Sequence, residues 1–272
     1  MKWGHSPFAR KWGRTCLLAG FLTLGHAAAA EKAAPLFADG FEQYAAGFLP
    51  GAPWKEEMYN SGAVIQVDDG HVFRGKQALH VLTPANAIKR RGYVAIHLKG
   101  PFPSLQDEMF GRVMVWLDAA PEPAVQWTLL QGEGRSADDR YNAIYRLGLR
   151  EQGGTQIMAN FETTPPVRTN CMQQSKRSLP VRRWACVEWH MAVATQEMQF
   201  WIDGKPATHV KGRAAAPDAC QGDDLGGEWR APPRFDSLYM GFERYGDTTN
   251  DQNLWMDDVV LAKQRIGCPK SK

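Results

Sequence analysis

Short runs of hydrophobic residues, many alternating with polar ones, recur along most of the chain and are separated by Gly, Pro, Asn and Asp. Alternation with a period of two is typical of strands with one buried face, and helical periodicity is scarce after residue 31. The expected strands are residues 77–83, 93–100, 111–118, 125–134, 142–151, 155–163, 184–193, 197–204, 237–245 and 254–262. This density of strands and turns predicts an all-β sandwich or jelly roll.

The chain has no internal repeat and no linker that would divide it, so residues 31–272 are expected to form a single domain. Two long segments, residues 163–183 and 212–233, are expected to be irregular loops. Each contains cysteine, which would make such a loop rigid.

The N-terminal residues have the layout of a secretory signal peptide. A basic start is followed by an apolar run over residues 16–30 that ends in small residues, Ala28 and Ala30. The run is too short to span a membrane comfortably. We therefore expect cleavage after Ala30 and a secreted or periplasmic protein without a membrane anchor.

The net charge changes when this segment is removed. The whole chain carries a formal charge of +3, and residues 1–30 contain four basic and no acidic side chains, so that the remainder has a charge of −1. A nucleic-acid-binding protein would need a basic surface. The composition therefore argues against nucleic acid as a partner. We also expect a monomer.

Four cysteines remain after residue 30, an even number that suits an oxidising compartment. They are Cys171, Cys186, Cys220 and Cys268. Three pairings are possible, among them one that joins Cys171 to Cys186 and Cys220 to Cys268. The absence of a C-x-x-C motif from the sequence argues against a zinc site.

Alternation also predicts which side chains face away from the core. If the strands share one sheet, its outer face carries large polar and aromatic groups that suit a sugar polymer. These residues are His97, Gln126, Arg146, Arg150, Asn160, Glu162, Tyr239, Glu243 and Tyr245. The simpler interpretation is an antiparallel sheet with one solvated face.

Two neighbouring carboxylates, Asp257 and Asp258, interrupt the hydrophobic strand 254–262. One of them must point inward, where a carboxylate without a partner is costly. A calcium ion shared with Glu42 near the other end of the chain would satisfy it. Alternatively, one of the pair caps loop amides or forms an ion pair with Arg265.

Several segments resemble known proteins. "ADGFE", "VFRGKQALHV", "WACVEWHMAVATQEMQFWIDG" and "WMDDVVLAKQRIGC" resemble the concanavalin A-like jelly rolls, and more narrowly the secreted family of the fungal cellulose-induced protein and the glucuronan lyases. The resemblance covers most of residues 36–269 and implies two antiparallel sheets with a concave groove. It also implies a structural calcium ion bound by Glu42, Asp257 and the carbonyls of Gly70 and Val72.

Active members of this family cleave uronic-acid polymers by β-elimination, which needs a base, an acid and a group that neutralises the carboxylate. The resemblance implies His97 and Tyr245 as the proton-transfer residues. We expect Arg146 to bind the substrate carboxylate with help from Gln126, because a guanidinium makes bidentate contacts. Five residues are expected to bind further sugar units: Arg150, Asn160, Glu162, Tyr239 and Glu243.

The expected function is therefore binding or cleavage of a polysaccharide, either a polyuronate or another plant or microbial cell-wall glycan. A non-catalytic carbohydrate-binding module of the same fold is the alternative. A glycoside hydrolase is the third possibility, and it would need two carboxylates across the groove. Glu162 and Glu243 are the only outward candidates found by alternation.

Overall fold

The structure is a computed structural model of the 272-residue chain. It describes residues 34–58, 62–85, 91–123, 125–151, 155–167, 169–211, 221–222 and 230–270. The predicted signal peptide and Cys220 lie outside these ranges. In the part that is described, no helix is long and apolar enough to cross a membrane.

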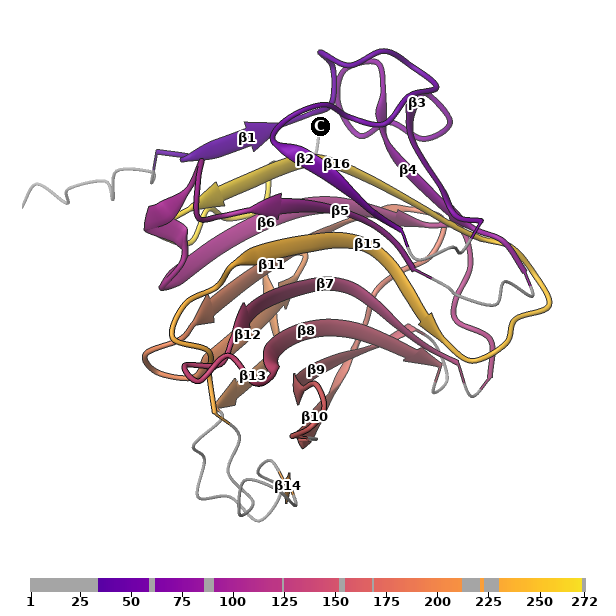
Figure 1. Cartoon of the computed structure of the whole chain (residues 1–272). Helices are drawn as coiled ribbons and strands as arrows, with labels where there is room; N and C mark the ends of the chain where they lie inside the picture. The colour runs from indigo at the N-terminus through magenta and orange to yellow at the C-terminus, as the bar shows by residue number, and fades with distance from the viewer. Residues whose placement is uncertain are drawn as a thin grey trace, which may run out of the picture. The chain divides into compact units, whose positions relative to one another are not determined.

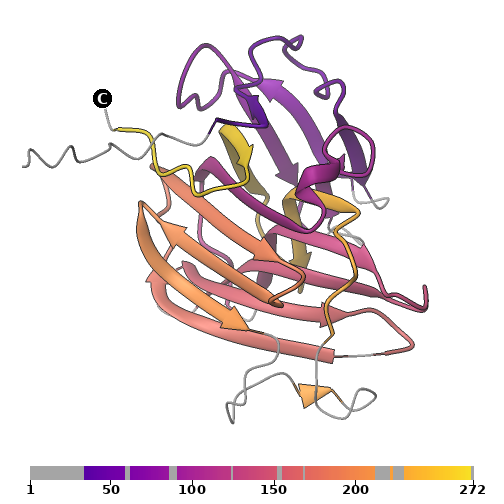
Figure 2. The same cartoon turned by 90° about the vertical axis from the view of Figure 1, so that its left-hand side faces the viewer.

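Two antiparallel eight-stranded sheets form the described fold, which confirms the predicted all-β jelly-roll class (Figures 1 and 2). Sheet A has the order β13-β12-β11-β6-β16-β4-β3, with β1 also paired to β16. Its strands are β1 (Phe37–Asp39), β3 (Val64–Asp68), β4 (Ala78–Thr83), β6 (Glu108–Leu117), β11 (Trp184–Ala192), β12 (Glu197–Ile202), β13 (Lys205–Lys211) and β16 (Gln252–Ala262).

Sheet B has the order β14-β10-β9-β8-β7-β15-β5-β2. Its strands are β2 (Trp54–Met58), β5 (Arg91–His97), β7 (Gln126–Arg135), β8 (Asn142–Glu151), β9 (Thr155–Thr163), β10 (Thr169–Ser178), β14 (Gln221–Gly222) and β15 (Ser237–Tyr245). A short 3-10 helix, η1 (Pro103–Leu105), precedes β6.

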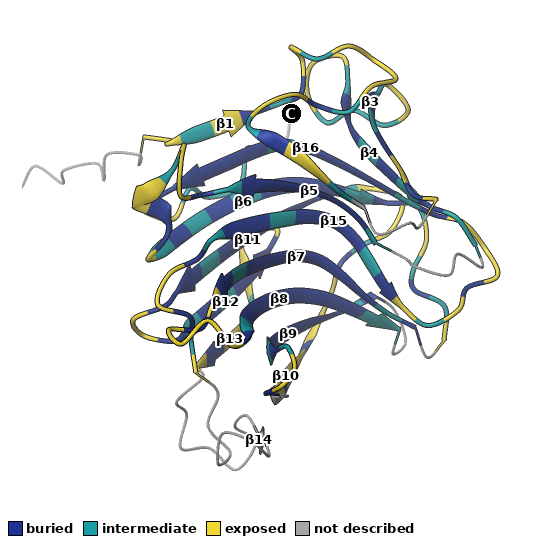
Figure 3. Ribbon diagram, in the orientation of Figure 1, coloured by how far each residue is buried: buried dark blue, intermediate teal, exposed yellow. Residues whose placement is uncertain are grey.

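The core lies between the two sheets because one side of most strands is apolar (Figure 3). Tyr145 of β8 shows how the sheets meet, since its ring packs edge-on against Phe235 and its hydroxyl donates to the Ala192 carbonyl of β11. The hydrophobic residues predicted to face inward on β5, β7, β8, β9 and β15 all belong to this core.

Every predicted strand segment contains a strand, but the prediction of a loop over residues 163–183 is wrong. Strand β10 runs through it and pairs with β9. Its sequence, TNCMQQSKRS, lacks the apolar alternation of the other strands. The reason is its place near the edge of sheet B, where Gln173 and Ser175 occupy the positions that face sheet A.

The first and last strands are neighbours, because β1 pairs with β16. A second link holds the C-terminal tail: Cys186 of β11 forms a disulfide with Cys268. This bond excludes the pairing of Cys171 with Cys186. Cys171 is disulfide-bonded as well.

Gly111 of β6 provides a test of this packing. A Cβ atom there would lie 1.9 Å from Cζ2 of Trp189, which is 0% exposed and cannot move aside easily. We expect Gly111→Ala to lower the free energy of unfolding by about 3 kcal/mol through overpacking. Gly100→Ala is the control, since no atom lies within 4 Å of the place that its added methyl group would occupy. Equal denaturant midpoints for the two variants would contradict the packing described.

Candidate functional site

The outer face of sheet B, which points away from sheet A, gathers polar and aromatic side chains in rows that cross the strands. In one row Tyr239 of β15 lies opposite Gln131 of β7, Gln131 lies opposite Arg146 of β8, and Arg146 lies opposite Asn160 of β9. Adjacent strands are about 4.8 Å apart, so these side chains are direct neighbours.

A β-bulge in β7 brings Gln131 into this row. Thr128 pairs with Gly148 and Leu130 with Leu147, so β7 has one extra residue at this point. Leu129 and Leu130 both enter the core. The alternation of faces therefore changes phase, and Gln131 and Glu133 reach the outer face. Strict alternation from Gln126 had placed them inside, which is why sequence reasoning missed both.

Arg146 lies at the centre of the outer face and is only 6% exposed. Its Nε donates to Oε1 of Gln131 at 3.1 Å, and its Nη1 forms an ion pair with Glu162. Its Nη2 lies 3.9 Å from Oε2 of Glu243, and the guanidinium carbon sits 5.6 Å from the ring centroid of Tyr245. The guanidinium is thus held in place by amide and carboxylate partners.

Glu243 has a second basic partner, Arg91, which the sequence analysis overlooked because it precedes the expected strand. Nη2 of Arg91 lies 2.7 Å from Oε1 of Glu243. The Arg91 guanidinium covers the ring of Tyr93, 5.7 Å from its centroid. Tyr93 reaches across Gly241 towards β7, where its hydroxyl lies 3.4 Å from the carbonyl oxygen of Thr128. A Cβ at Gly241 would be 2.2 Å from the Gly92 carbonyl, so only glycine fits there.

His97 lies on the same face but not beside Tyr245. His97 pairs with Ser237 at the start of β15, and its Nδ1 is 2.9 Å from the Ser237 hydroxyl oxygen. Tyr245 is at the other end of β15, roughly 26 Å along an extended strand. The expected pairing of His97 with Tyr245 in one proton-transfer site is therefore wrong.

Tyr239 is the tyrosine that lies near His97. It is opposite Ala95 of β5, two residues before His97, which makes the two side chains diagonal neighbours at about 7–8 Å. Burial and the charge of Glu133 raise the pKa of Tyr239 to about 12. Its phenol therefore keeps its proton at neutral pH and can donate it.

Gln126 and Arg150 also lie at the Tyr245 end of the face. Gln126 is opposite both Tyr245 and Arg150, and Arg146 is separated from it by the bulge. The structure therefore does not bring Gln126 next to Arg146, and Gln131 takes that position. The contribution of the other proposed sugar-binding residues remains a prediction.

Two carboxyl groups of the outer face hold protons more readily than usual. Burial raises the pKa of Glu133 and of Glu162, although nearby Arg146 opposes the shift in each case. Glu133 accepts hydrogen bonds from the side chains of Gln131 and Asn142. The face therefore contains fixed amides, one buried and one partly exposed guanidinium group, and carboxyl groups in varied environments, the kinds of group that recognise hydroxyls and carboxylates.

The expected calcium ligands meet at one loop, away from this face. Asp257 is 0% exposed, and its Oδ2 accepts the amides of Phe73 and Arg74 at 3.0 and 2.9 Å. Oε1 of Glu42 accepts the amides of Lys76 and Gln77. Gly70 and Val72 lie at the start of the same loop. The two carboxylates, far apart in sequence, thus hold one short segment.

The two carboxylates accept these loop amides. Carboxylate and carbonyl oxygens are also the ligands that a calcium ion prefers, so the same residues fit a bound cation. No cationic side chain in the described ranges pairs with Asp257, and the second oxygen of Glu42 has no hydrogen-bond partner there. A Cβ at Gly75 would lie 2.3 Å from Glu42, so glycine is required where the loop approaches this carboxylate. Asp258 pairs with Arg112 and Arg74, while Arg265 binds Glu188, so the alternative pair of Asp258 with Arg265 is wrong.

Comparison with known proteins supports this architecture. Residues 57–264 match the family model described as Polysacc_lyase-like, Cip1-like, core domain. The chain belongs to this family. No curated protein matches the chain.

Two solved structures share the fold. The cellulose-induced protein Cip1 aligns with a TM-score of 0.59 and 16% identity, over 86% of this chain and all of that chain. The endo-beta-1,4-glucuronan lyase from the fungus Trichoderma reesei aligns with a TM-score of 0.56 and 12% identity, over 85% and 96% of the two chains. At these identities the likeness shows the fold alone.

Arg146 should stabilise the outer face as well as form part of the site. Replacing it with leucine leaves Gln131 and Glu162 without their partner, and we expect a loss of about 3 kcal/mol in the free energy of unfolding. Arg150→Leu is the matched control, because Arg150 lies on the same strand and no contact of its side chain is found in the described residues. Chemical denaturation of both variants measures the difference, and an equal effect would contradict a held guanidinium.

Proposed function

We propose that this chain is an exported polysaccharide lyase that binds a uronic-acid polymer across the outer face of sheet B and cleaves it by β-elimination. The observation that supports this best is a continuous row on one face: His97 is diagonal to Tyr239, Tyr239 lies opposite Gln131, and Gln131 lies opposite Arg146. The family to which the chain belongs supports a polysaccharide as the ligand.

In this proposal His97 is the base. It removes the proton next to the uronate carboxylate, and the electron pair left behind forms a carbon–carbon double bond as the bond to the glycosidic oxygen breaks. Because Ser237 engages Nδ1, the other ring nitrogen, Nε2, is available for the substrate. Tyr239 gives its proton to the departing oxygen; with its pKa raised to about 12, the phenol is protonated at neutral pH.

Arg146 and Gln131 would neutralise the uronate carboxylate and make the neighbouring proton removable. The guanidinium is oriented before substrate arrives, because Gln131 and Glu162 already hold it. Such orientation in advance lowers the cost of organising the site during the reaction. The substrate carboxylate would approach the edge of Arg146 that faces Glu243 at 3.9 Å, the weaker of its two ion pairs.

A non-catalytic carbohydrate-binding protein is the second candidate. One observation favours it: Glu162 and Glu243 already partly neutralise Arg146, which weakens its attraction for a substrate carboxylate. A binding protein would use the same face and its tyrosines without proton transfer.

We also propose that calcium binds between Glu42 and Asp257, with carbonyl groups near Gly70 and Val72 completing the ligand set. Bound calcium would supply charge compensation for the buried Asp257 carboxylate. It would fasten β16 to the loop before β4, remote from the proton-transfer residues.

The lyase assay should follow the absorbance of the new double bond while the protein without residues 1–30 is incubated with polyuronates. We expect His97→Ala and Tyr239→Phe each to lower kcat by a factor of 100 or more, on the order of the usual contribution of a general acid or base. Tyr245→Phe is the control: it keeps the ring beside the Arg146 guanidinium and removes only a hydroxyl at the far end of β15 from His97, so it should retain most activity. Because the Tyr239 phenol keeps its proton up to about pH 12, its ionisation should not limit the rate at pH 7–10.

The result that would contradict lyase activity is an absence of the double bond with every polyuronate while glycan binding persists. Retained binding would then support the second candidate. Loss of activity in Tyr245→Phe but not in Tyr239→Phe would contradict the assignment of the proton donor.

Calcium binding predicts a different outcome. Addition of a chelator should lower Tm at neutral pH, and an excess of calcium should restore it, since a ligand that binds only the folded state stabilises it. Asp257→Asn should abolish most of this calcium-dependent shift. A Tm that chelator leaves unchanged in the wild type would contradict the proposed metal site.

A further inference from the structure

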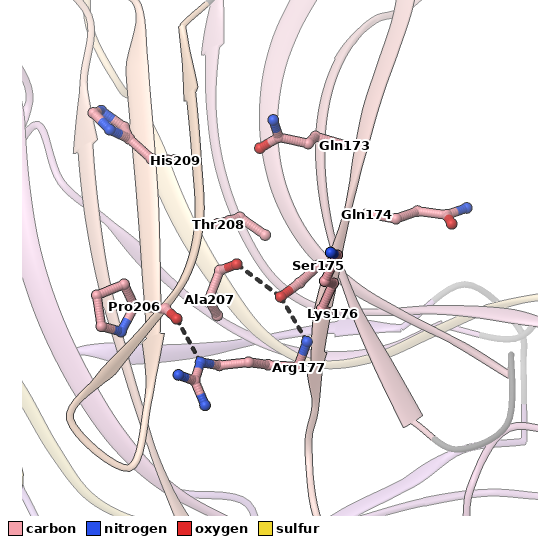
Figure 4. Close-up of a pocket in the computed structure, with 9 residues that line it drawn as sticks. All are labelled: Gln173, Gln174, Ser175, Lys176, Arg177, Pro206, Ala207, Thr208 and His209. Atoms are coloured by element: carbon pink, nitrogen blue, oxygen red, sulfur yellow. Dashed lines mark hydrogen bonds between the residues drawn. The ribbon is translucent and has the colours of Figure 1, made fainter.

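A hollow separate from the outer face of sheet B lies at the open edge of the sandwich, between β10 of sheet B and β13 of sheet A (Figure 4). Its volume is about 580 Å³, within the usual range for small-molecule sites. Two contacts join the strands beside it: Ser175 Oγ donates to the Ala207 carbonyl at 2.7 Å, and Arg177 Nε donates to the Pro206 carbonyl at 2.6 Å. We call this hollow the edge pocket.

The lining of the edge pocket is polar and lacks carboxylates. Gln173 and Gln174 supply amides, and Ser175 and Thr208 supply hydroxyls. Thr208 is 6% exposed, and its Oγ1 has no hydrogen-bond partner in the part of the chain described. Amides and hydroxyls of this kind recognise the hydroxyls of a sugar.

The charge of the edge pocket comes from Lys176 and Arg177. Neither side chain has an acidic partner among the described residues, and the Arg177 guanidinium uses only Nε in the contact with Pro206. His209 differs, because Glu197 lies 2.5 Å from its Nε2. The pocket therefore offers an ammonium group and the outer edge of a guanidinium, which bind a carboxylate or a sulfate group.

The position of the edge pocket relates it to the proposed catalytic site. Arg146 of β8 lies opposite Asn160 of β9, and Asn160 lies opposite Met172 of β10, so that β10 is two strand spacings, about 10 Å, from Arg146. The pocket begins at the next residue, Gln173. A polymer that crosses the outer face from Tyr239 towards Asn160 and continues round the edge of β10 would meet the exposed side chains of Lys176 and Arg177 there.

We propose that the edge pocket is a distal subsite that binds an acidic sugar residue of the same polysaccharide. This inference rests on the proposed function, because it takes the polymer to lie across sheet B. Lys176 and Arg177 bind the carboxylate of a uronate unit, and the amides and hydroxyls bind its ring hydroxyls. The subsite increases affinity for long acidic chains and takes no part in bond cleavage.

The test compares a polyuronate with a neutral glucan of similar length, by calorimetric titration of the full mature protein. Lys176→Glu should weaken polyuronate binding about tenfold and make it less sensitive to salt, because an exposed ionic contact is screened. Binding of the neutral glucan should not change. Lys270→Glu is the control for net charge, since Lys270 is exposed and lies outside the pocket lining.

Lys176 has no described side-chain contact, so Lys176→Glu should keep the wild-type Tm. Arg177→Lys is a second variant, which keeps the positive charge of the pocket. Turnover of uronate trimers should be unchanged in Lys176→Glu, because Lys176 lies four residues along β10 from Met172, on the order of 13 Å, in addition to the two strand spacings from Arg146. If Lys176→Glu and Lys270→Glu bind the polyuronate equally, the edge pocket is not a subsite, whereas the proposed function stands. If the wild type binds no polyuronate at all, the proposed function fails as well.

Discussion

The single extra residue in β7 is the constraint on which the arrangement of the outer face depends. Without the bulge at Leu129, Gln131 and Glu133 would point into the core and Leu130 would face solvent. Arg146 would then lose its amide partner, and Tyr239 would face an apolar side chain. A local change in backbone register therefore decides which chemistry is available on one side of sheet B.

The second requirement is that buried charges on this face remain paired. Arg146 is almost fully buried, and an isolated guanidinium there would be very unfavourable. Glu162, Glu243 and Gln131 satisfy it and at the same time fix its orientation. The same contacts that hold the site rigid also compete with an incoming carboxylate. The extent to which Glu162 and Glu243 neutralise Arg146 therefore decides between lyase activity and simple binding.

The sequence allowed prediction of the fold because alternation in strands such as β8 and β9 is strong and one face is clearly apolar. It failed for β10, whose inward positions are polar because they line the open edge of the sandwich. It also placed Arg146 correctly on the outer face and beside Tyr245, but it selected Gln126 to assist Arg146 and Tyr245 as the partner of His97. Strand register decides between Tyr239 and Tyr245, and pairing between strands distant in sequence cannot be obtained from alternation within one strand.

The most direct test of the central claim is a crystal structure of the His97→Ala variant with a bound oligouronate. The variant should bind the sugar without cleaving it. The account predicts a uronate carboxylate beside Arg146 and Gln131, with the bond to be cleaved next to Tyr239. Sugar bound beside Gln126 and Arg150 with none next to Tyr239, or sugar on sheet A, would contradict it.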